Sequence, residues 1–329
     1  MIQQNTRLAL HFLLGIFLTA PVIASTKSVD ESDMQRFIDE MAKQHKFEPG
    51  ALKELLGNAK IHQSILDAIS RPAEAKPWYK YRTIFLNPAR IKGGVEFWNE
   101  HALILKQASQ KYGVPPEIIT AIIGVETRYG RHKGTFPVID SLATLAFAYP
   151  PRSKFFRGEL KEFLLMTREE KIDPSTQLGS YAGAMGMPQF ISSSFRSYAV
   201  DFDGDGYRDL WNTPADAIGS VANYFKRHGW QKGQPVVAQV STHGKDFKQL
   251  IGNDLKPSET YRSLKKYGVK FNKVYPADLK GTLLELDSGT KQPEYWVGWQ
   301  NFYVISRYNH SAHYSMAVYQ LAQEIRKQR

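Results

Sequence analysis

The 329-residue sequence contains no cysteine. This absence excludes disulfide bonds, a thiol nucleophile and thiolate metal sites, and it leaves no residue for an N-terminal lipoprotein anchor. A chain of this length can bury a sizeable hydrophobic core, so an exported domain of this size does not need disulfides. We therefore expect a fold held together by its core, without a lipid anchor.

Long apolar runs are also scarce. One such run, residues 8–18 (LALHFLLGIFL), follows Arg7 and precedes the small-residue stretch 20–25 (APVIAS). A charged start, a short apolar stretch and the spacing Val22-x-Ala24 are typical of a secretory signal peptide. The alternative is an uncleaved membrane anchor, but the run is short for a spanning helix. We predict a signal peptide over residues 1–24 and export of the chain.

A concentrated patch of one charge is likewise missing from the sequence. The net charge is +11, but the basic residues are scattered in groups no larger than pairs such as Lys265–Lys266. A positive charge attracts polyanions such as nucleic acid, anionic lipid or an acidic cell wall. Because the chain has no basic stripe and is predicted to be exported, the cell wall is a better candidate partner than nucleic acid.

Apolar residues at three- and four-residue spacing predict helix over most of the chain. The helical stretches are expected at 29–70, 95–112, 116–130, 140–166 (interrupted at 150–151), 215–228 and 311–329. Between the first two stretches, Pro72 and Pro77 are expected to break the chain before an aromatic connector at 78–81 (WYKY). Glycine and alanine dominate residues 179–187, which predicts close backbone approach there.

Shorter segments near the C-terminal end have the composition of strands. We expect strands at 235–240, 282–286 and 295–299, with 302–305 as a fourth. The sequence therefore predicts an α+β fold that is mostly α, with a small antiparallel β module over residues 232–306.

Glu126 stands late in a predicted helix whose preceding residues, 118–125 (IITAIIGV), are mostly apolar. Burial and the negative end of a helix dipole both disfavour a charged carboxylate, so both raise its pKa. A raised pKa suits a general acid that works near neutral pH. The alternative is an exposed glutamate paired with Arg128 or Arg131, and the helical pattern alone does not separate the two.

Four motifs occur in order along the chain. They are residues 124–130 (GVETRYG) with 136–142 (FPVIDSL), 180–186 (SYAGAMG) with 189–190 (QF), 216–225 (DAIGSVANYF), and 307–311 (RYNHS). Together they resemble the signatures of the lytic murein transglycosylase B family, from about residue 30 to the C-terminus. Met187 and Pro188 stand where members of the family vary, and we assign them no role.

The resemblance implies a lysozyme-like core with a helical domain and a small β module. The implied domains are a helical domain over 25–112, joined by a C-terminal helix at 311–329, a catalytic core with a calcium loop over 113–231, and the β module over 232–306. Family members are often lipid-anchored through an N-terminal cysteine. Because this chain has none, we expect it in the periplasm, either soluble or peripherally associated.

The resemblance also implies cleavage of the bond between N-acetylmuramic acid and N-acetylglucosamine in peptidoglycan. Glu126 would protonate the glycosidic oxygen and then accept the proton of the muramic acid C6 hydroxyl, which gives a 1,6-anhydro sugar. A second catalytic carboxylate is then unnecessary, unlike in most glycosidases. The positions that match substrate-binding residues of the family are Tyr81, Ser180, Gln189, Phe190, Tyr224, Tyr308, Asn309 and Tyr314.

An acidic loop, residues 201–209 (DFDGDGYRD), follows the pattern of a calcium-binding loop. Position 12 of the pattern is Asn212, where a bidentate glutamate is usual, so Asp216 is the candidate to complete the site. A metal-free turn held by side-chain hydrogen bonds is one alternative, and a loop that binds magnesium or sodium in place of calcium is another. We predict a structural Ca²⁺ held by Asp201, Asp203, Asp205, Tyr207, Asp209 and Asp216.

Two other functions remain compatible with these residues. A hydrolytic muramidase would need a second carboxylate or a held water molecule opposite Glu126, and Asp140 is the nearest candidate carboxylate downstream. A non-catalytic, calcium-stabilised peptidoglycan-binding protein would keep the aromatic residues and the acidic loop but would not depend on Glu126.

Overall fold

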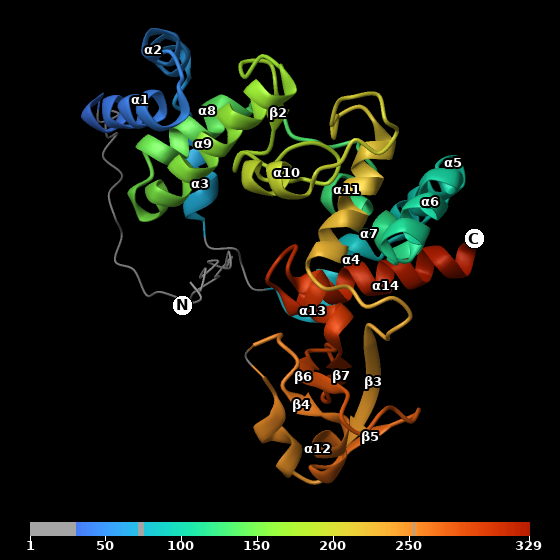
Figure 1. Ribbon diagram of the computed structural model, residues 1–329. Helices are drawn as coiled ribbons and strands as arrows, with labels where there is room; N and C mark the ends of the chain where they lie inside the picture. The colour runs from blue at the N-terminus through green and yellow to red at the C-terminus, as the bar shows by residue number, and fades with distance from the viewer. Residues whose placement is uncertain (1–30, 72–75, 253) are drawn as a thin grey trace, which may run out of the picture. The chain divides into compact units, whose positions relative to one another are not determined.

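The computed structural model describes residues 31–71, 76–252 and 254–329 (Figure 1). Within these ranges the chain forms two compact units. We call them the helical unit (31–71, 85–227 and 320–329) and the sheet unit (76–84, 228–252 and 254–319). The predicted signal peptide lies outside the described residues. In the described part of the chain, no helix has both the length and the apolar character needed to span a membrane.

The helical unit is built from helices packed around the strongly apolar helices α7 and α8. Its elements are α1 (Glu31–His45), α2 (Pro49–Asn58), α3 (Gln63–Ser70), α5 (Pro88–Glu100), α6 (Ala102–Tyr112), α7 (Pro116–Thr127), β1 (Phe136–Pro137), α8 (Val138–Phe147), η1 (Pro150–Arg152), α9 (Ser153–Glu170), β2 (Leu178–Gly179), α10 (Ser192–Tyr198) and α11 (Pro214–Arg227). Every residue of α8 is buried, as are ten of the twelve residues of α7. Helices that are apolar on all sides belong in a core.

The predicted helix at 95–112 is two helices, and this corrects its boundaries. The chain leaves helical geometry at His101, which has φ −109° and ψ 27° and lies between the end of α5 and the start of α6. The first helix also begins earlier than expected, at Pro88, where Asn87 accepts a hydrogen bond from the Arg90 backbone N–H at 3.0 Å. An asparagine cap followed by proline is a strong helix start.

The sheet unit contains a five-stranded antiparallel sheet in the order β4-β6-β7-β3-β5. Its elements are α4 (Trp78–Phe85), β3 (Val237–Thr242), η2 (Asp246–Leu250), β4 (Glu259–Thr260), α12 (Tyr261–Lys266), β5 (Val269–Phe271), β6 (Lys280–Leu286), β7 (Glu294–Gly298), α13 (Gln300–Ser306) and α14 (Ala312–Gln328), whose last residues join the helical unit. The predicted fold class, mostly helical with a small antiparallel sheet, is confirmed.

The fourth predicted strand, 302–305, is wrong because these residues form α13. Phe302 and Tyr303 donate backbone hydrogen bonds to the carbonyl of Trp299, which starts the helix directly after β7. Phe302, Val304 and Ile305 are all buried. A short apolar run fits a buried helix as well as a buried strand, so its composition could not decide.

The expected connector at 78–81 is also a helix, α4. The carbonyl of Pro77 accepts hydrogen bonds from the backbone of Lys80 and Tyr81, so this proline starts a helix instead of only breaking the chain. Trp78 is fully buried and packs against His313 with ring centroids 5.7 Å apart. Packing inside the sheet unit therefore stabilises a helix that the aromatic residues alone do not favour.

Candidate active site

Glu126 lies one residue before the end of α7 and is half-buried. The helix ends earlier than the predicted Gly130, at Thr127. Arg128, Tyr129 and Gly130 all then have positive φ, at 50°, 62° and 81°. Two non-glycine residues in the left-handed region store strain, and such strain is concentrated at functional sites. The chain thus reverses sharply beside the candidate acid.

Arg90 of α5 clamps the end of α7 at the residues before Glu126. Its guanidinium donates to the carbonyl of Gly124 and, at 3.4 Å, to that of Val125. The Tyr129 hydroxyl donates in return to the Arg90 carbonyl at 2.7 Å. A Cβ on Gly124 would lie 2.6 Å from the Tyr129 ring, so glycine is required for this approach. No sequence motif marks Arg90, so its contact with α7 could not be predicted from the sequence.

Burial shifts the pKa of both members of this clamp. Desolvation lowers the pKa of Arg90, which is only 8% exposed, and it raises the pKa of the Tyr129 hydroxyl. The Arg90 guanidinium also counters the negative end of the α7 dipole.

Thr127 connects the end of α7 to the second motif. Its hydroxyl lies 2.8 Å from the carbonyl of Met187 and accepts a hydrogen bond from the Gly130 N–H at 3.0 Å. This contact ties the residue next to Glu126 to a residue two positions before Gln189. Sequence motifs that are about 60 residues apart therefore meet within the helical unit.

Residues 178–190 fold back on themselves through tight backbone contacts. Gly179 bridges to Met185, and Met185 bridges to Phe190. A Cβ on Gly179 would lie 2.5 Å from the Ala184 carbonyl, and one on Gly186 would lie 2.5 Å from the Leu210 carbonyl. The prediction of close backbone approach in this glycine-rich segment is confirmed.

Ser180 and Gln189 have their side chains fixed inside this fold. The Ser180 hydroxyl accepts backbone hydrogen bonds from Ala182 and Ala184, at 3.3 and 3.0 Å. Gln189 has φ 50°, and its amide group donates to the carbonyls of Lys133 and Gly186 at 3.2 and 2.9 Å. A polar side chain held on a strained backbone is preorganised, which favours a role in ligand binding.

Phe190 and Tyr224 support the site from the core. Phe190 is 2% exposed, and its ring centroid lies 5.6 Å from that of Tyr224, which is also buried. Tyr224 packs in turn on the edge of Tyr198 at 4.9 Å. In this structure the two rings contact each other and the core, so they have little surface to offer a sugar.

Four predicted substrate residues belong to the sheet unit: Tyr81, Tyr308, Asn309 and Tyr314. Tyr81 stacks near Trp78 and His313, with ring centroids 6.4 and 5.5 Å away. Asn309 is exposed, whereas Tyr314 is buried. The other predicted residues, Glu126, Ser180, Gln189, Phe190 and Tyr224, lie in the helical unit.

The acidic loop brings three of its predicted ligands together. Carboxylate oxygens of Asp201, Asp203 and Asp205 lie within 4.8 Å of one another. Asp201 also accepts backbone hydrogen bonds, from Gly206 at 2.8 Å and from Gly204 at 2.7 Å, which hold its pKa below the ordinary value. A cluster of three carboxyl groups supplies the hard oxygen donors that Ca²⁺ prefers.

Asp209 and Asp216 lie outside this cluster, and Tyr207 is predicted to contribute its backbone carbonyl and not its side chain. Asp209 accepts backbone hydrogen bonds from Trp211 and Asn212, and the side chain of Tyr207 is exposed. Asp216 is 1% exposed and accepts from the backbone of Phe202 and Asp209, at 2.7 and 2.8 Å. Desolvation raises the pKa of Asp216 to about 6. In this structure Asp216 therefore joins the two ends of the acidic loop, because it accepts hydrogen bonds from a backbone N–H group near each end.

Asp140, the candidate second carboxylate, is engaged in structural contacts. It is 6% exposed; one oxygen accepts from the Lys60 backbone N–H at 3.0 Å, and the other lies 3.0 Å from Nε2 of His62. These contacts join α8 to the segment between α2 and α3. A carboxylate with both oxygens bound in the interior is poorly placed to activate water.

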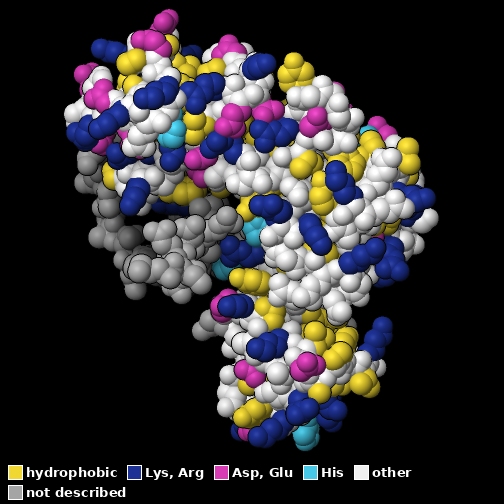
Figure 2. Space-filling model, viewed as in Figure 1, with side chains coloured by type: hydrophobic (Ala, Val, Ile, Leu, Met, Phe, Trp, Pro, Cys, Tyr) yellow, Lys and Arg dark blue, Asp and Glu magenta, His cyan; other side chains and the backbone are white. Residues whose placement is uncertain are grey.

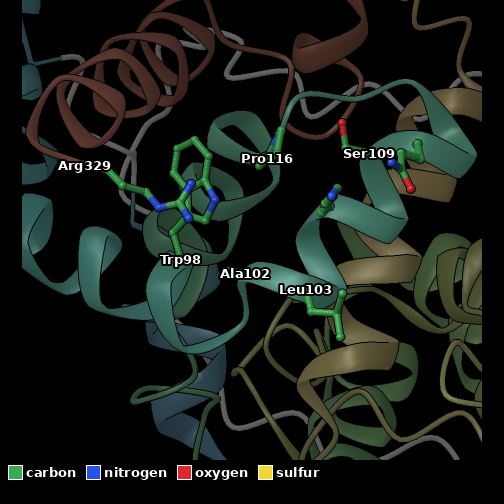
Figure 3. Close-up of a pocket in the computed structure, with 8 residues that line it drawn as sticks. Trp98, Ala102, Leu103, Ser109, Pro116 and Arg329 are labelled. Carbon is green, nitrogen blue, oxygen red and sulfur yellow. The ribbon is translucent and has the colours of Figure 1, made fainter.

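A pocket of about 390 Å³ lies elsewhere in the helical unit, between α5, α6 and the start of α7 (Figure 3). Arg329 lies over the ring of Trp98, with its guanidinium carbon 4.4 Å from the ring centroid, and Leu103 points away from them. None of the predicted catalytic or substrate-binding residues lines this pocket.

A family model described as the transglycosylase SLT domain matches residues 30–323. The membrane-bound lytic murein transglycosylase B of Escherichia coli K12 is 46% identical over 301 residues, which cover 88% of this chain and 82% of the relative. This chain belongs to the lytic murein transglycosylase B family. It is a peptidoglycan lytic transglycosylase.

Solved structures agree with this assignment. Soluble lytic transglycosylase SltB1 of Pseudomonas aeruginosa is 51% identical, with a TM-score of 0.86 over 90% of this chain and 98% of its own. Escherichia coli Slt35 in complex with calcium is 45% identical, with a TM-score of 0.84 over 90% and 93%. Pseudomonas aeruginosa SltB3 in complex with NAG-anhNAM-pentapeptide is 30% identical, with a TM-score of 0.80 over 90% and 79%.

Proposed function

We propose that this transglycosylase cleaves the β-1,4 bond between N-acetylmuramic acid and N-acetylglucosamine and forms a 1,6-anhydromuramoyl product, with Glu126 as its sole general acid and base. The observation that carries the proposal is the position of Glu126, half-buried at the clamped end of α7, while Asp140 is bound in the interior. The SltB3 structure with an anhydromuramoyl peptide supports the same product here.

The chemistry requires one carboxyl group at two stages. Protonated Glu126 donates its proton to the glycosidic oxygen as the C1–O bond breaks. The resulting carboxylate then takes the proton from the C6 hydroxyl of the muramic acid, whose oxygen bonds to C1. Because the nucleophile belongs to the substrate, the usual second carboxylate is not required.

The side chains proposed to bind the glycan divide into two kinds. Ser180, Gln189 and Asn309 have hydroxyl or amide groups that suit the N-acetyl groups of the substrate, and Tyr81 and Tyr308 have rings that suit its sugar faces. Tyr224, Tyr314 and Phe190 are buried. We propose that these three act by supporting the other binding side chains, which are half-buried or, for Asn309, exposed.

We also propose that the acidic loop holds a structural Ca²⁺. Asp201, Asp203 and Asp205 would supply the carboxylate ligands, and Tyr207 would supply its backbone carbonyl. The cluster of three carboxylates and the calcium complex of Slt35 support this proposal. Bound there, the ion would neutralise the loop and would take no part in bond cleavage.

The remaining proposals concern location and organisation. The signal-like residues 1–24 and a peptidoglycan substrate support action in the periplasm. A helical domain over 25–112 with 311–329, a catalytic core over 113–231 and a β module over 232–306 remain our proposed functional division. The five strands of the sheet, all within 237–298, support the last of these boundaries.

If Glu126 is the sole acid and base, the chain should release anhydromuropeptides from peptidoglycan, and this release should depend on Glu126. Purified sacculi are incubated with the wild-type chain and with Glu126→Gln, and the released muropeptides are weighed by mass spectrometry. We expect wild-type products that are lighter by one water than reducing-end muropeptides, and a loss of release with Glu126→Gln of on the order of a thousandfold or more, because the variant cannot transfer the proton.

Two results would contradict the proposal that the chain is a transglycosylase with Glu126 as its sole acid and base. Reducing-end products from the wild type would indicate a hydrolase with a second carboxylate. Full activity of Glu126→Gln would exclude it as the acid. Asp140→Asn is the matched control, and it should retain anhydro products even though its stability falls.

A further inference from the structure

A pocket of the sheet unit is lined by three lysines that lie within nine residues of one another, and by a histidine from a separate segment of the chain. Lys265 from α12, Lys270 from β5 and Lys273 just beyond it line one pocket of about 540 Å³, with His243 from the end of β3. Figure 2 shows basic side chains gathered with a histidine at the lower end of the view, where Figure 1 places α12 and β5. We call these four residues and Val274 the β-tip surface.

Backbone contacts between the segment around His243 and the segment around Gly268 hold the β-tip surface together. The His243 N–H donates to the Gly268 carbonyl at 2.9 Å, and β3 pairs with β5 through Ser241 and Lys270. A Cβ on Gly268, which has φ 92°, would lie 2.3 Å from the His243 carbonyl oxygen. The basic groups are therefore carried by a defined backbone and not by an extended loop.

Aromatic rings form the wall of the pocket below the lysines. Tyr261 and Phe271 pack edge to face, with centroids 4.8 Å apart, and the ammonium group of Lys265 lies 5.4 Å from the centre of the Tyr261 ring. This packing supports the lysines from below. Their side chains are exposed, so their charges remain in contact with solvent.

The charge of the β-tip surface is not neutralised by the protein. The lining of the pocket includes no acidic side chain. Within the described part of the chain, Lys265, Lys270 and Lys273 take part in no salt bridge. Arg196 and Arg208 of the helical unit, by contrast, are paired with glutamates of α9. Residues 243–274 as a whole contain eight lysines and arginines against three acidic residues.

An apolar side chain stands among these charges. Val274 directly follows Lys273 and is 89% exposed, the highest value among the large hydrophobic residues that are exposed in the described chain. An edge strand is often protected by lysines, but an exposed valine does not serve that purpose. Lysines around a protruding apolar side chain are suited to the interface of an anionic bilayer, where phosphates meet acyl chains.

We propose that the β-tip surface docks the sheet unit on a bilayer containing anionic phospholipid. The lysines contact the phosphates of the headgroups, and Val274 enters the interface between them. A planar anionic surface explains both the spread of charge and the exposed valine, whereas a small soluble anion explains only the charge. This proposal does not depend on the role of Glu126.

The test is sedimentation of the full chain with vesicles. Vesicles of phosphatidylethanolamine with phosphatidylglycerol are compared with vesicles of phosphatidylcholine alone, at low and high salt. We expect binding to the anionic vesicles only, and weaker binding as salt rises. Replacing Lys270 and Lys273 by glutamate should reduce partitioning by more than the roughly thirtyfold expected for loss of two lysine charges. Charged side chains still protect the β5 edge in this variant.

Further variants test whether binding to the vesicles depends on the β-tip surface itself. Replacing Lys43 and Lys53, exposed residues of the helical unit, by glutamate changes the net charge equally and should leave most of the binding intact. Val274→Ser keeps all charges and should weaken binding to the anionic vesicles without affecting folding, because the side chain is exposed. Retained release of muropeptides in the absence of vesicles shows that each variant is folded.

Three outcomes would overturn the proposal. They are equal binding to neutral vesicles, equal losses for the two double variants, and release of the chain from vesicles by soluble glycerol phosphate at matched phosphate concentration. Loss of binding to sacculi with unchanged binding to vesicles would instead identify the acidic cell wall as the partner of this surface.

Discussion

Arg90 illustrates how a residue outside every motif can hold the backbone next to the proposed catalytic acid, Glu126. Its guanidinium holds the carbonyls of Gly124 and Val125, directly before Glu126, and the Phe85 ring lies 5.2 Å from its charged carbon. The last carbonyls of a helix have no partner within the helix, so a buried cation is an effective cap. Arg90 therefore sets the position from which Glu126 extends.

This arrangement predicts a double effect for Arg90→Met. Two charged hydrogen bonds are lost in the interior, and we expect the free energy of unfolding to fall by about 2 kcal/mol or more. Turnover should fall more than substrate affinity, because Glu126 loses its fixed position. Urea denaturation and steady-state kinetics measure the two effects.

The control for this substitution is Lys92→Met on the exposed face of the same helix. Lys92 is 79% exposed and forms only a surface pair with Glu96. Its replacement should change stability by less than about 0.5 kcal/mol. If both variants behaved alike, Arg90 would have no special role at α7.

At the scale of elements, α10 depends on a buried carboxylate from α9. Glu159 accepts a hydrogen bond from the Ser193 N–H at 3.0 Å, at the start of α10. It is buried, and desolvation raises its pKa above the ordinary value of 4.5. The first N–H groups of a helix need an acceptor, so the cost of burying this carboxylate is offset by the cap that it provides.

The burial of Glu159 makes stability depend on pH, because desolvation raises its pKa more than the hydrogen bonds from Ser193 lower it. An acid whose pKa is raised on folding binds its proton more tightly in the folded chain. Its contribution to stability is therefore full below about pH 4.5, the ordinary pKa, and is lost as the pH rises through the folded-state value. We expect wild type to lose stability relative to Glu159→Gln as the pH rises from below 4.5 to neutral. Thermal unfolding of both proteins across this range measures the difference, and a constant or opposite difference would contradict the prediction.

At the scale of the whole molecule, the acidic loop connects distant parts of the helical unit. Arg208 of the loop pairs with Glu170 at the end of α9, and Asp216 of α11 accepts from the backbone of the loop. An ion that binds the folded loop, but not the unfolded chain, stabilises the unit as a whole.

Calcium should therefore raise the melting temperature of the chain. At a concentration one hundred times its dissociation constant, the gain is about 2.7 kcal/mol. Asp201→Asn together with Asp203→Asn should abolish the response, whereas Asp278→Asn, an exposed aspartate outside the loop, should retain it. Differential scanning calorimetry with calcium and with a chelator measures the effect. An equal shift in all three proteins would show that the loop is not the site.

Several features of this protein were accessible from the sequence because they are local. The three-to-four-residue spacing of apolar side chains predicted most of the helices, and the glycines of 179–187 predicted close backbone approach. The motif around Glu126 is contiguous, so it could be recognised without a fold. Where composition was ambiguous, packing in the folded chain selected helix over connector or strand: Trp78 is buried in α4, and five residues of α13 are buried.

What only the tertiary structure decided is which distant residues meet. The contact between Arg90 and Gly124 joins residues that are 34 positions apart in the sequence, and the contact between Thr127 and Met187 joins residues 60 positions apart. Asp140 contacts His62, which lies 78 positions before it. The lysines of the β-tip surface lie close together in the sequence, whereas the pairing of β3 with β5 brings His243, more than 20 positions away, to the same pocket. Local pattern specifies the elements, because their hydrogen bonds are short in sequence. Contacts between elements depend on packing, which no short window of sequence contains.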